Sequence, residues 1–117
     1  MKTSHMLIDL LSVNQAQKEI TVNEAFLRFD SLLNTGAENF ISNLPDDPLN
    51  GTLYIVHAII EDTADVLLHG MEKSIVYYVS GKGWNFIQPR EGCMLWVIQE
   101  KGLYVFHDSS WVVLLKV

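Results

Sequence analysis

The sequence is poor in the residues that mark disulfide scaffolds, nucleic-acid binders and membrane proteins. Its one cysteine, Cys93, cannot form an internal disulfide bond, and its eight lysines and arginines are outnumbered by fourteen aspartates and glutamates. The resulting net charge of −6 argues against a basic surface for phosphate groups, so we expect no nucleic-acid partner. No apolar run approaches the ~18 residues of a membrane-spanning helix, so we also expect no membrane insertion.

The N-terminus lacks the pattern of a signal peptide, because Lys2, His5 and Asp9 interrupt its apolar residues. We therefore expect a protein that is cytoplasmic when synthesised. Cys93 precedes Met94 in an apolar stretch, with no histidine or basic residue next to it. This setting favours a small packed side chain over a reactive thiol.

Patterns of catalysis and metal binding are missing as well. The His-Asp-Ser-Ser run at 107–110 has the letters of a hydrolase triad, but adjacent turn residues cannot point at one another. His57 and His69 have no cysteine near them, and the aspartates at 46–47 lack the alternating spacing of a calcium loop. The Ser-Gly-Lys-Gly run at 80–83 lacks the spacing of a Walker phosphate-binding loop. We expect no enzyme, no metal and no cofactor.

The clearest helix signal begins at Thr21, which forms a capping box with Glu24. Apolar residues then recur at helical spacing along one face: Val22, Phe26, Phe29 and Leu33. Gly36 is expected to end the helix as its left-handed C′ residue, and residues 37–50 to form a connector. The apolar face predicts either packing on the domain's own sheet or an oligomer interface, and two heptads are too few to indicate a coiled coil.

The rest of the chain is rich in short β-prone stretches separated by turn residues. We predict strands at 52–57, 74–80, 84–88, 93–99, 103–107 and 110–117. Residues 58–73 are acidic with an apolar base, which is typical of a surface loop or an added hairpin.

A repeated pattern organises these strands. The pair Tyr77 and Trp84 recurs as Tyr104 and Trp111 at the same spacing, and the motif Pro-x-x-Gly occurs upstream of each copy, at 48–51 and at 89–92. The repeat predicts two hairpins that share the same arrangement of strands and turn. Specific function is then expected where the copies differ, in residues 58–73 and the neighbouring Tyr78 and Lys82.

The tryptophans of the repeat allow two interpretations. Trp84 and Trp111 stand at tight hairpins, where aromatic cross-strand contacts stabilise a sheet. Tryptophan and tyrosine also stack on sugar rings and anchor protein interfaces. A candidate surface for a ligand or partner therefore consists of Tyr78, Lys82, Trp84 and Trp111.

A set of motifs in a fixed order carries a family resemblance: Gln15-Ala-Gln-Lys18, Thr21-Val-Asn-Glu-Ala25, Asp30, Pro45-x-x-Pro48-x-x-Gly51-x-x-Tyr54-x-Val56, Trp84, Pro89-Arg-Glu-Gly92, Trp96-Val97 and Trp111. In these the chain resembles an uncharacterised phage-related domain family of alphaproteobacteria, found in prophages and gene-transfer-agent-like particles beside tail and tail-fibre proteins. The resemblance implies a virion structural or host-recognition component and carries over no catalytic residue. Residues 58–73 depart from the family pattern, so no shared ligand site is carried over there.

Together these observations predict an α+β fold, mostly antiparallel β, with one N-terminal amphipathic helix followed by two unequal β-hairpin units. We expect a single domain over 1–117, with an arm and helix at 7–36, a first β-unit at 37–88 and a second at 89–117.

The expected function is that of a non-enzymatic phage-tail-like or prophage-derived structural or adhesion module located in a virion or phage-tail-like particle. It is expected to be a homo-oligomer, with a trimer favoured by analogy to fibres, and to bind other tail proteins, host-surface proteins or glycans. The alternative is a stand-alone bacterial binding or regulatory protein of phage origin that acts through protein–protein contacts.

Overall fold

The computed structural model of the chain describes residues 2–3, 22–29 and 36–117. The chain divides into two compact units, Met1–Thr35 and Gly36–Val117, which are described separately. In the first unit, residues 22–29 are helical, in the place that the capping box predicts. On the predicted apolar face Val22 and Phe26 are half-buried and Phe29 is 62% exposed, while Thr21 and Leu33 lie outside the described residues.

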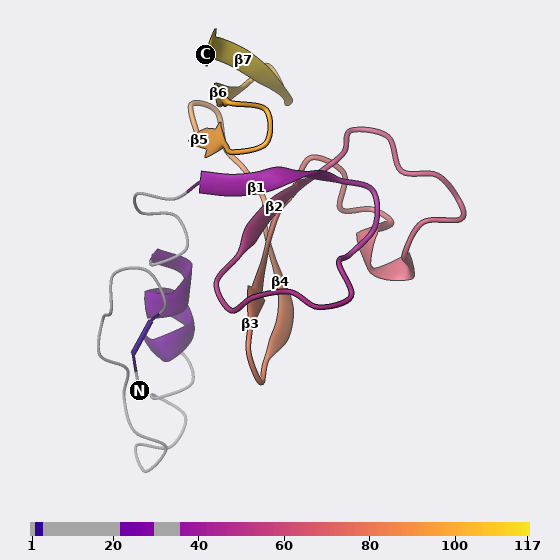
Figure 1. Cartoon of the computed structure of the whole chain (residues 1–117), viewed down its shortest axis with the longest axis vertical. Coiled ribbons are helices and arrows are strands. Elements are labelled where there is room, and N and C mark those ends of the chain that lie inside the picture. The colour runs from indigo at the N-terminus through magenta and orange to yellow at the C-terminus, as the bar shows by residue number, and fades with distance from the viewer. Residues whose placement is uncertain (1, 4–21, 30–35) are drawn as a thin grey trace. The chain divides into compact units, whose positions relative to one another are not determined.

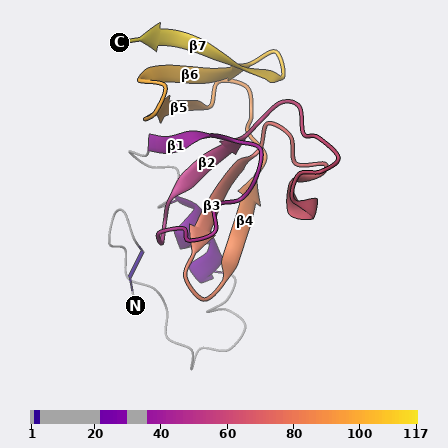
Figure 2. The same cartoon turned by 45° about the vertical axis from the view of Figure 1, so that its right-hand side comes forward.

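The second unit is built on one seven-stranded sheet with the strand order β4-β3-β2-β1-β5-β6-β7 (Figures 1 and 2). The strands are β1 (Gly36–Ile41), β2 (Leu53–Val56), β3 (Ile75–Val79), β4 (Gly83–Ile87), β5 (Met94–Val97), β6 (Gly102–His107) and β7 (Ser110–Lys116). The strands β2 to β7 confirm the six strands expected from the sequence to within a few residues.

The central strand, β1, was not expected. It pairs in parallel with β2 through Ala37 and Leu53, and in parallel with β5 through Gly36 and Trp96. The predicted helix end at Gly36 is therefore wrong, because Gly36 is the first residue of a strand, and the predicted connector at 37–50 is wrong for its first five residues.

The expected fold class is wrong for the same reason. A helix followed by two hairpin units would leave two separate antiparallel units, whereas β1 joins both into one mixed sheet that is mainly β. The described helix covers only residues 22–29. Parallel pairing requires crossover connections rather than tight turns, so hairpin signals alone could not reveal it.

Each side of β1 carries an antiparallel three-stranded meander, β2-β3-β4 on one side and β5-β6-β7 on the other. The two meanders repeat a specific contact: the Gly51 amide donates to the Tyr78 carbonyl over 2.7 Å, and the Gly92 amide donates to the Phe106 carbonyl over 2.8 Å. The glycines of both Pro-x-x-Gly motifs therefore hold equivalent places, as the repeat predicts.

The tryptophans hold equivalent places too, but their cross-strand partners differ from those expected. Trp84 pairs with Tyr78, and Trp111 pairs with Phe106, so the partners are not Tyr77 and Tyr104. The partner lies six residues before Trp84 but five before Trp111, because three residues connect β3 to β4, whereas two residues, at 108–109, connect β6 to β7.

The sheet buries a cluster of apolar side chains on each face. Along β2, Leu53 and Ile55 belong to one cluster and Val56 to the other, as the alternation of side chains across a strand requires. The first and larger cluster consists of Ala37, Leu53, Ile55, Ile75, Tyr77, Ile87, Leu95 and Val97, with Trp111 and Tyr104 packed against it.

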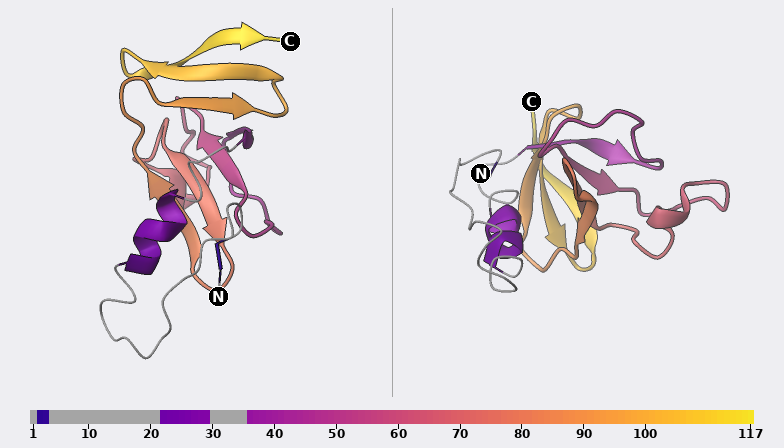
Figure 3. Two further views of the ribbon diagram at one scale, coloured as in Figure 1. Left: turned by 90° about the vertical axis from the view of Figure 1, so that its left-hand side faces the viewer. Right: turned by 90° about the horizontal axis from the view of Figure 1, so that it is seen from below.

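The tip of the β6–β7 hairpin reaches across the first cluster to the start of β3. The Trp111 indole Nε1 donates to the Lys73 carbonyl over 2.9 Å, and the Lys73 Nζ donates to the Ser109 carbonyl over 2.7 Å. The sheet therefore curls over the larger cluster, and the two views in Figure 3 show the strong twist between its two halves.

A buried isoleucine and an exposed one give a test of this core. Replacing Ile55, which is 0% exposed, by alanine is expected to lower the free energy of unfolding by about 2–5 kcal/mol. Replacing Ile59, which is 82% exposed, by alanine should change it by less than about 0.5 kcal/mol. Urea unfolding of both variants measures the difference, and equal effects would contradict the position of β2 in the core.

Candidate functional site

The two meanders differ most in the connection between their first and second strands. In the second meander, residues 98–101 make a tight turn in which the Lys101 amide donates to the Ile98 carbonyl over 3.2 Å. In the first meander the same connection runs from His57 to Ser74 and contains a short 3-10 helix, Val66–Leu68. This long connection is the segment in which specific function was expected from the sequence repeat.

The long connection is fastened to the sheet at several points. Leu68 is fully buried in the second cluster. The Leu44 amide donates to the Asp65 carboxylate over 2.7 Å, and the Asp65 amide donates to the Asn43 side-chain oxygen over 3.1 Å. These reciprocal bonds tie the connection to the turn that follows β1.

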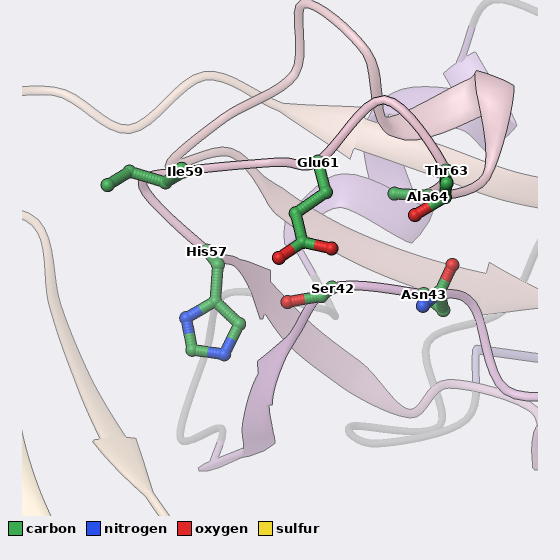
Figure 4. A pocket seen from close by; sticks show the side chains of 7 residues that line it. All are labelled: Ser42, Asn43, His57, Ile59, Glu61, Thr63 and Ala64. Atoms are coloured by element: carbon green, nitrogen blue, oxygen red, sulfur yellow. The ribbon is translucent and has the colours of Figure 1, made fainter.

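A pocket of about 420 Å³ lies between the long connection and the end of β1. Figure 4 shows the Glu61 carboxylate pointing toward Ser42 and His57, while the Ile59 side chain points away from the others. The lining residues are Ser42, Asn43, His57, Ile59, Glu61, Thr63 and Ala64. A volume of this size lies within the ~300–1,000 Å³ of small-molecule sites.

The pocket offers hydrogen-bonding groups of several kinds. Glu61 supplies two acceptor oxygens, Ser42 and Thr63 supply hydroxyl groups, and the Asn43 amide can donate while its oxygen accepts from Asp65. The His57 ring stacks on Phe40, with ring centroids 5.8 Å apart, and this contact holds the imidazole at the rim. The lining therefore combines hydrogen-bond donors and acceptors, the groups with which a polar neutral ligand would pair.

Metal binding and thiol chemistry find no support in the described part of the chain. Among residues 2–3, 22–29 and 36–117, no group of three or more histidine, cysteine, aspartate or glutamate side chains could hold a metal ion. Cys93 packs half-buried against the larger cluster, and burial raises the pKa of its thiol above the ordinary value. A raised pKa disfavours the thiolate at neutral pH, as the packing interpretation of Cys93 predicts.

The residues of the predicted ligand surface lie elsewhere and are split between the two faces of the sheet. Tyr78 and Trp84 meet edge to face at 5.2 Å, and Tyr54 lies 6.0 Å from Trp84. Trp111 packs against the other cluster, and Lys82 is exposed in the β3–β4 turn. None of the four predicted residues lines the pocket.

The aromatic group around Trp84 is half-buried. Tyr54 and Trp84 both pack against the cluster of Val56, Leu68 and Val76. Partial burial raises the pKa of Tyr54, and the nearby Glu38 carboxylate raises it further. The stabilising role weighed for Trp84 fits this packing better than that of an open stacking platform.

Sequence reasoning missed the pocket residues Ser42 and Asn43, which it placed in a connector. It did single out residues 58–73, which supply Ile59, Glu61 and Thr63. The repeat was the useful signal, because the inserted residues stand out against the shorter copy.

The His-Asp-Ser-Ser run at 107–110 spans the turn between β6 and β7, which consists of Asp108 and Ser109. Glu91 holds this turn: one carboxylate oxygen lies 2.6 Å from the His107 Nδ1, and the other accepts from the Asp108 amide over 3.0 Å. Asp108 and Ser109 have positive φ angles of 50° and 61°, the backbone of a two-residue hairpin turn. His107 therefore has a carboxylate partner outside the run, on the loop before β5.

Fold and pocket together define a mainly β protein, a repeated meander flanking a central parallel strand, with a small-molecule-sized pocket in one inserted connection. The chain belongs to the family described as "Protein of unknown function (DUF2793)", whose model matches residues 22–112. No curated protein and no solved structure matches the chain. Among the helical residues that the structure describes, no helix is long and apolar enough to cross a membrane.

The Glu91 contacts predict a specific acid sensitivity. The hydrogen bond from His107, and then that from the Asp108 amide, hold the pKa of Glu91 below its ordinary value of 4.5. A carboxyl group with a lowered folded-state pKa stabilises the fold above the unfolded-state pKa, and this contribution is lost as the pH falls through the folded-state pKa.

We therefore expect Glu91→Gln to melt at a lower temperature than the wild type at pH 7, with the gap closing as the pH falls below 4.5. Melting curves between pH 7 and pH 3 measure this gap. The control Asp62→Asn, at an exposed position of the long connection, should follow the wild type throughout. A gap that stays constant with pH would contradict the ionic role of Glu91.

Proposed function

We propose that this chain is a non-enzymatic structural and adhesion module of a phage-tail-like or prophage-derived particle, and that its pocket recognises a glycan. The link to phage particles rests on the motif resemblance that covers most of the chain. The choice of a glycan rests on one observation, the mixture of hydrogen-bond donors and acceptors around the pocket of about 420 Å³.

Sugars suit this mixture because each hydroxyl group of a sugar both donates and accepts. The Glu61 carboxylate can accept from two neighbouring hydroxyl groups, and Asn43, Ser42 and Thr63 can complete the set. Bonds to a carboxylate are about twice as strong as those between neutral groups, so Glu61 supplies most of the specificity.

The position of the pocket also supports recognition. It lies in a connection carried by a rigid sheet, and loops on rigid scaffolds are where proteins place variable binding residues. The bonds from the Leu44 amide to the Asp65 carboxylate and from the Asp65 amide to the Asn43 side chain hold the two walls together, which supports a preorganised site.

A second candidate function is a stand-alone bacterial binding or regulatory protein that acts through protein–protein contacts. The observation that favours it is the set of exposed apolar residues on β7, among them Leu114 at 58% and Leu115 at 62% exposed. Both candidates include self-association, and a homo-oligomer is part of the proposal in either case.

Glycan-array screening followed by titration tests the proposal. We expect the wild type to bind at least one glycan, and Glu61→Ala to weaken that binding about tenfold or more, since a hydrogen bond to a charged group contributes ~1.5–3 kcal/mol. The matched control Asp62→Ala removes the same charge from a neighbouring residue that does not line the pocket. It should bind within about twofold of the wild type, because surface substitutions away from a site have small effects.

The absence of any retained glycan at millimolar concentration would contradict the adhesion role. Equal losses in Glu61→Ala and Asp62→Ala would contradict the assignment of the pocket, because general charge would then explain the binding.

A further inference from the structure

Of the described residues that line the pocket, one carries a full charge at neutral pH. It is Glu61, because no lysine or arginine is among these lining residues and histidine is counted as neutral. Among the described residues, ion pairs join His107 to Glu91 and Lys116 to Glu100, and neither pair includes Glu61. The pocket therefore presents a carboxylate for which a ligand can supply the opposite charge.

The two segments that form the pocket are acidic. Residues 38–50 and 57–72 contain none of the eight lysines and arginines of the chain, but half of its fourteen aspartates and glutamates. These seven acidic residues are Glu38, Asp46, Asp47, Glu61, Asp62, Asp65 and Glu72. The next residue, Lys73, donates to the Ser109 carbonyl over 2.7 Å and does not line the pocket.

Two of these carboxylates adjoin the pocket in addition to that of Glu61. Asp62 follows Glu61 in the chain, and the Asp65 carboxylate accepts from the Leu44 amide over 2.7 Å, one residue from the lining residue Asn43. A concave site surrounded by charge of one sign attracts ligands of the opposite sign and repels those of the same sign. The surroundings of the pocket therefore favour a cation over an anion.

The polar groups of the pocket suit the three N–H donors of an ammonium group. Glu61 has two acceptor oxygens, which point toward Ser42 in Figure 4, and the hydroxyl oxygens of Ser42 and Thr63 can accept as well. The Asn43 side-chain oxygen accepts from the Asp65 amide and keeps a second lone pair. A carboxylate on the ligand would instead bring only acceptors to a site that already holds one carboxylate.

We propose that the pocket selects sugars that carry a protonated amino group, and that Glu61 sets this preference. The inference rests on the proposed glycan function and narrows it, since hydrogen bonding alone would suit neutral and basic sugars alike. The ammonium group pairs with the Glu61 carboxylate, and ring hydroxyl groups bond to Ser42, Asn43 and Thr63. The same charge disfavours sugars that carry a carboxylate, phosphate or sulfate group.

The open position of Glu61 sets the size of the effect. The residue is exposed, so water and salt screen its attraction for a cation. We therefore expect a preference of about three- to tenfold for an amino sugar over its N-acetylated form, in which a neutral amide replaces the amine.

Titration of the full chain with six monosaccharides at pH 7, followed by nuclear magnetic resonance, tests this inference. The amino sugars are glucosamine and galactosamine, the neutral sugars are their N-acetylated forms, and the acidic sugars are glucuronic acid and galacturonic acid. We expect an amino sugar to bind about threefold or more tighter than its N-acetylated form, and the acids to bind most weakly. Raising the salt concentration from about 20 to about 500 mM should remove most of this preference, because salt screens exposed charges.

Two variants assign the preference to one carboxylate. Glu61→Gln keeps the size of the side chain and an acceptor oxygen but removes the charge, so amino and N-acetylated sugars should bind within about twofold of each other. The matched control Asp62→Asn removes a neighbouring charge that does not line the pocket, and it should keep the preference of the wild type. Circular dichroism checks that each variant folds. If Glu61→Gln does not fold, the salt series with the wild type decides.

Four results would overturn this inference while a sugar still binds and the glycan function stands. They are equal binding of amino and N-acetylated sugars, tightest binding of the acids, a preference that persists at high salt, and a preference that folded Glu61→Gln retains. Failure of all six sugars would overturn the inference as well, and an empty glycan array would in addition contradict the glycan function.

Putrescine, an amine without a sugar ring, separates recognition of the amine from recognition of the sugar. We expect it to bind more weakly than the amino sugars, because it lacks the ring hydroxyl groups that Ser42, Asn43 and Thr63 would bond. Equal binding of putrescine and glucosamine would show that the ring is not recognised, and this result would contradict the glycan function together with the choice of an amino sugar.

Discussion

The parallel pairing of β1 with β2 on one side and β5 on the other is the constraint on which the rest of the structure depends. Each meander begins with a strand whose neighbour is β1, so the backbone groups of β1 are shared between two otherwise separate hairpin systems. Ala37 makes this sharing possible, since it pairs with Leu53 and with Val97 and is fully buried in the larger cluster. Without β1, the two repeats would have no common sheet.

The strands of the meanders could be predicted because their own residues have high β-propensity and are bounded by turn residues. Runs of aliphatic and aromatic residues lie on both sides of glycine-containing turns, as on either side of Gly81. These runs predict strands, and the structure has strands there. β1 could not be predicted from such signals. Its residues Glu38 and Asn39 are poor strand formers, a register shift interrupts its pairing with β2, and its stability comes from neighbours distant in sequence.

The candidate site, like the fold, could be predicted only in part. The longer first repeat pointed to residues 58–73, and Glu61 within them lines the pocket. Ser42 and Asn43 join the pocket only because β1 ends beside the long connection, which is a consequence of parallel pairing. The ligand surface predicted at Tyr78, Lys82, Trp84 and Trp111 stays a prediction, and the structure shows that Trp84 and Trp111 pack against the two apolar clusters.

The two bonds that join Asp65 to Asn43 and Leu44 have a consequence for how the pocket would engage a ligand. Because the walls are already joined by backbone-to-side-chain bonds at 2.7 and 3.1 Å, little chain entropy remains to be lost on binding. Affinity then depends on the side chains that line the pocket and little on ordering the connection. The residues that line the pocket can therefore be exchanged while the surrounding backbone keeps its shape.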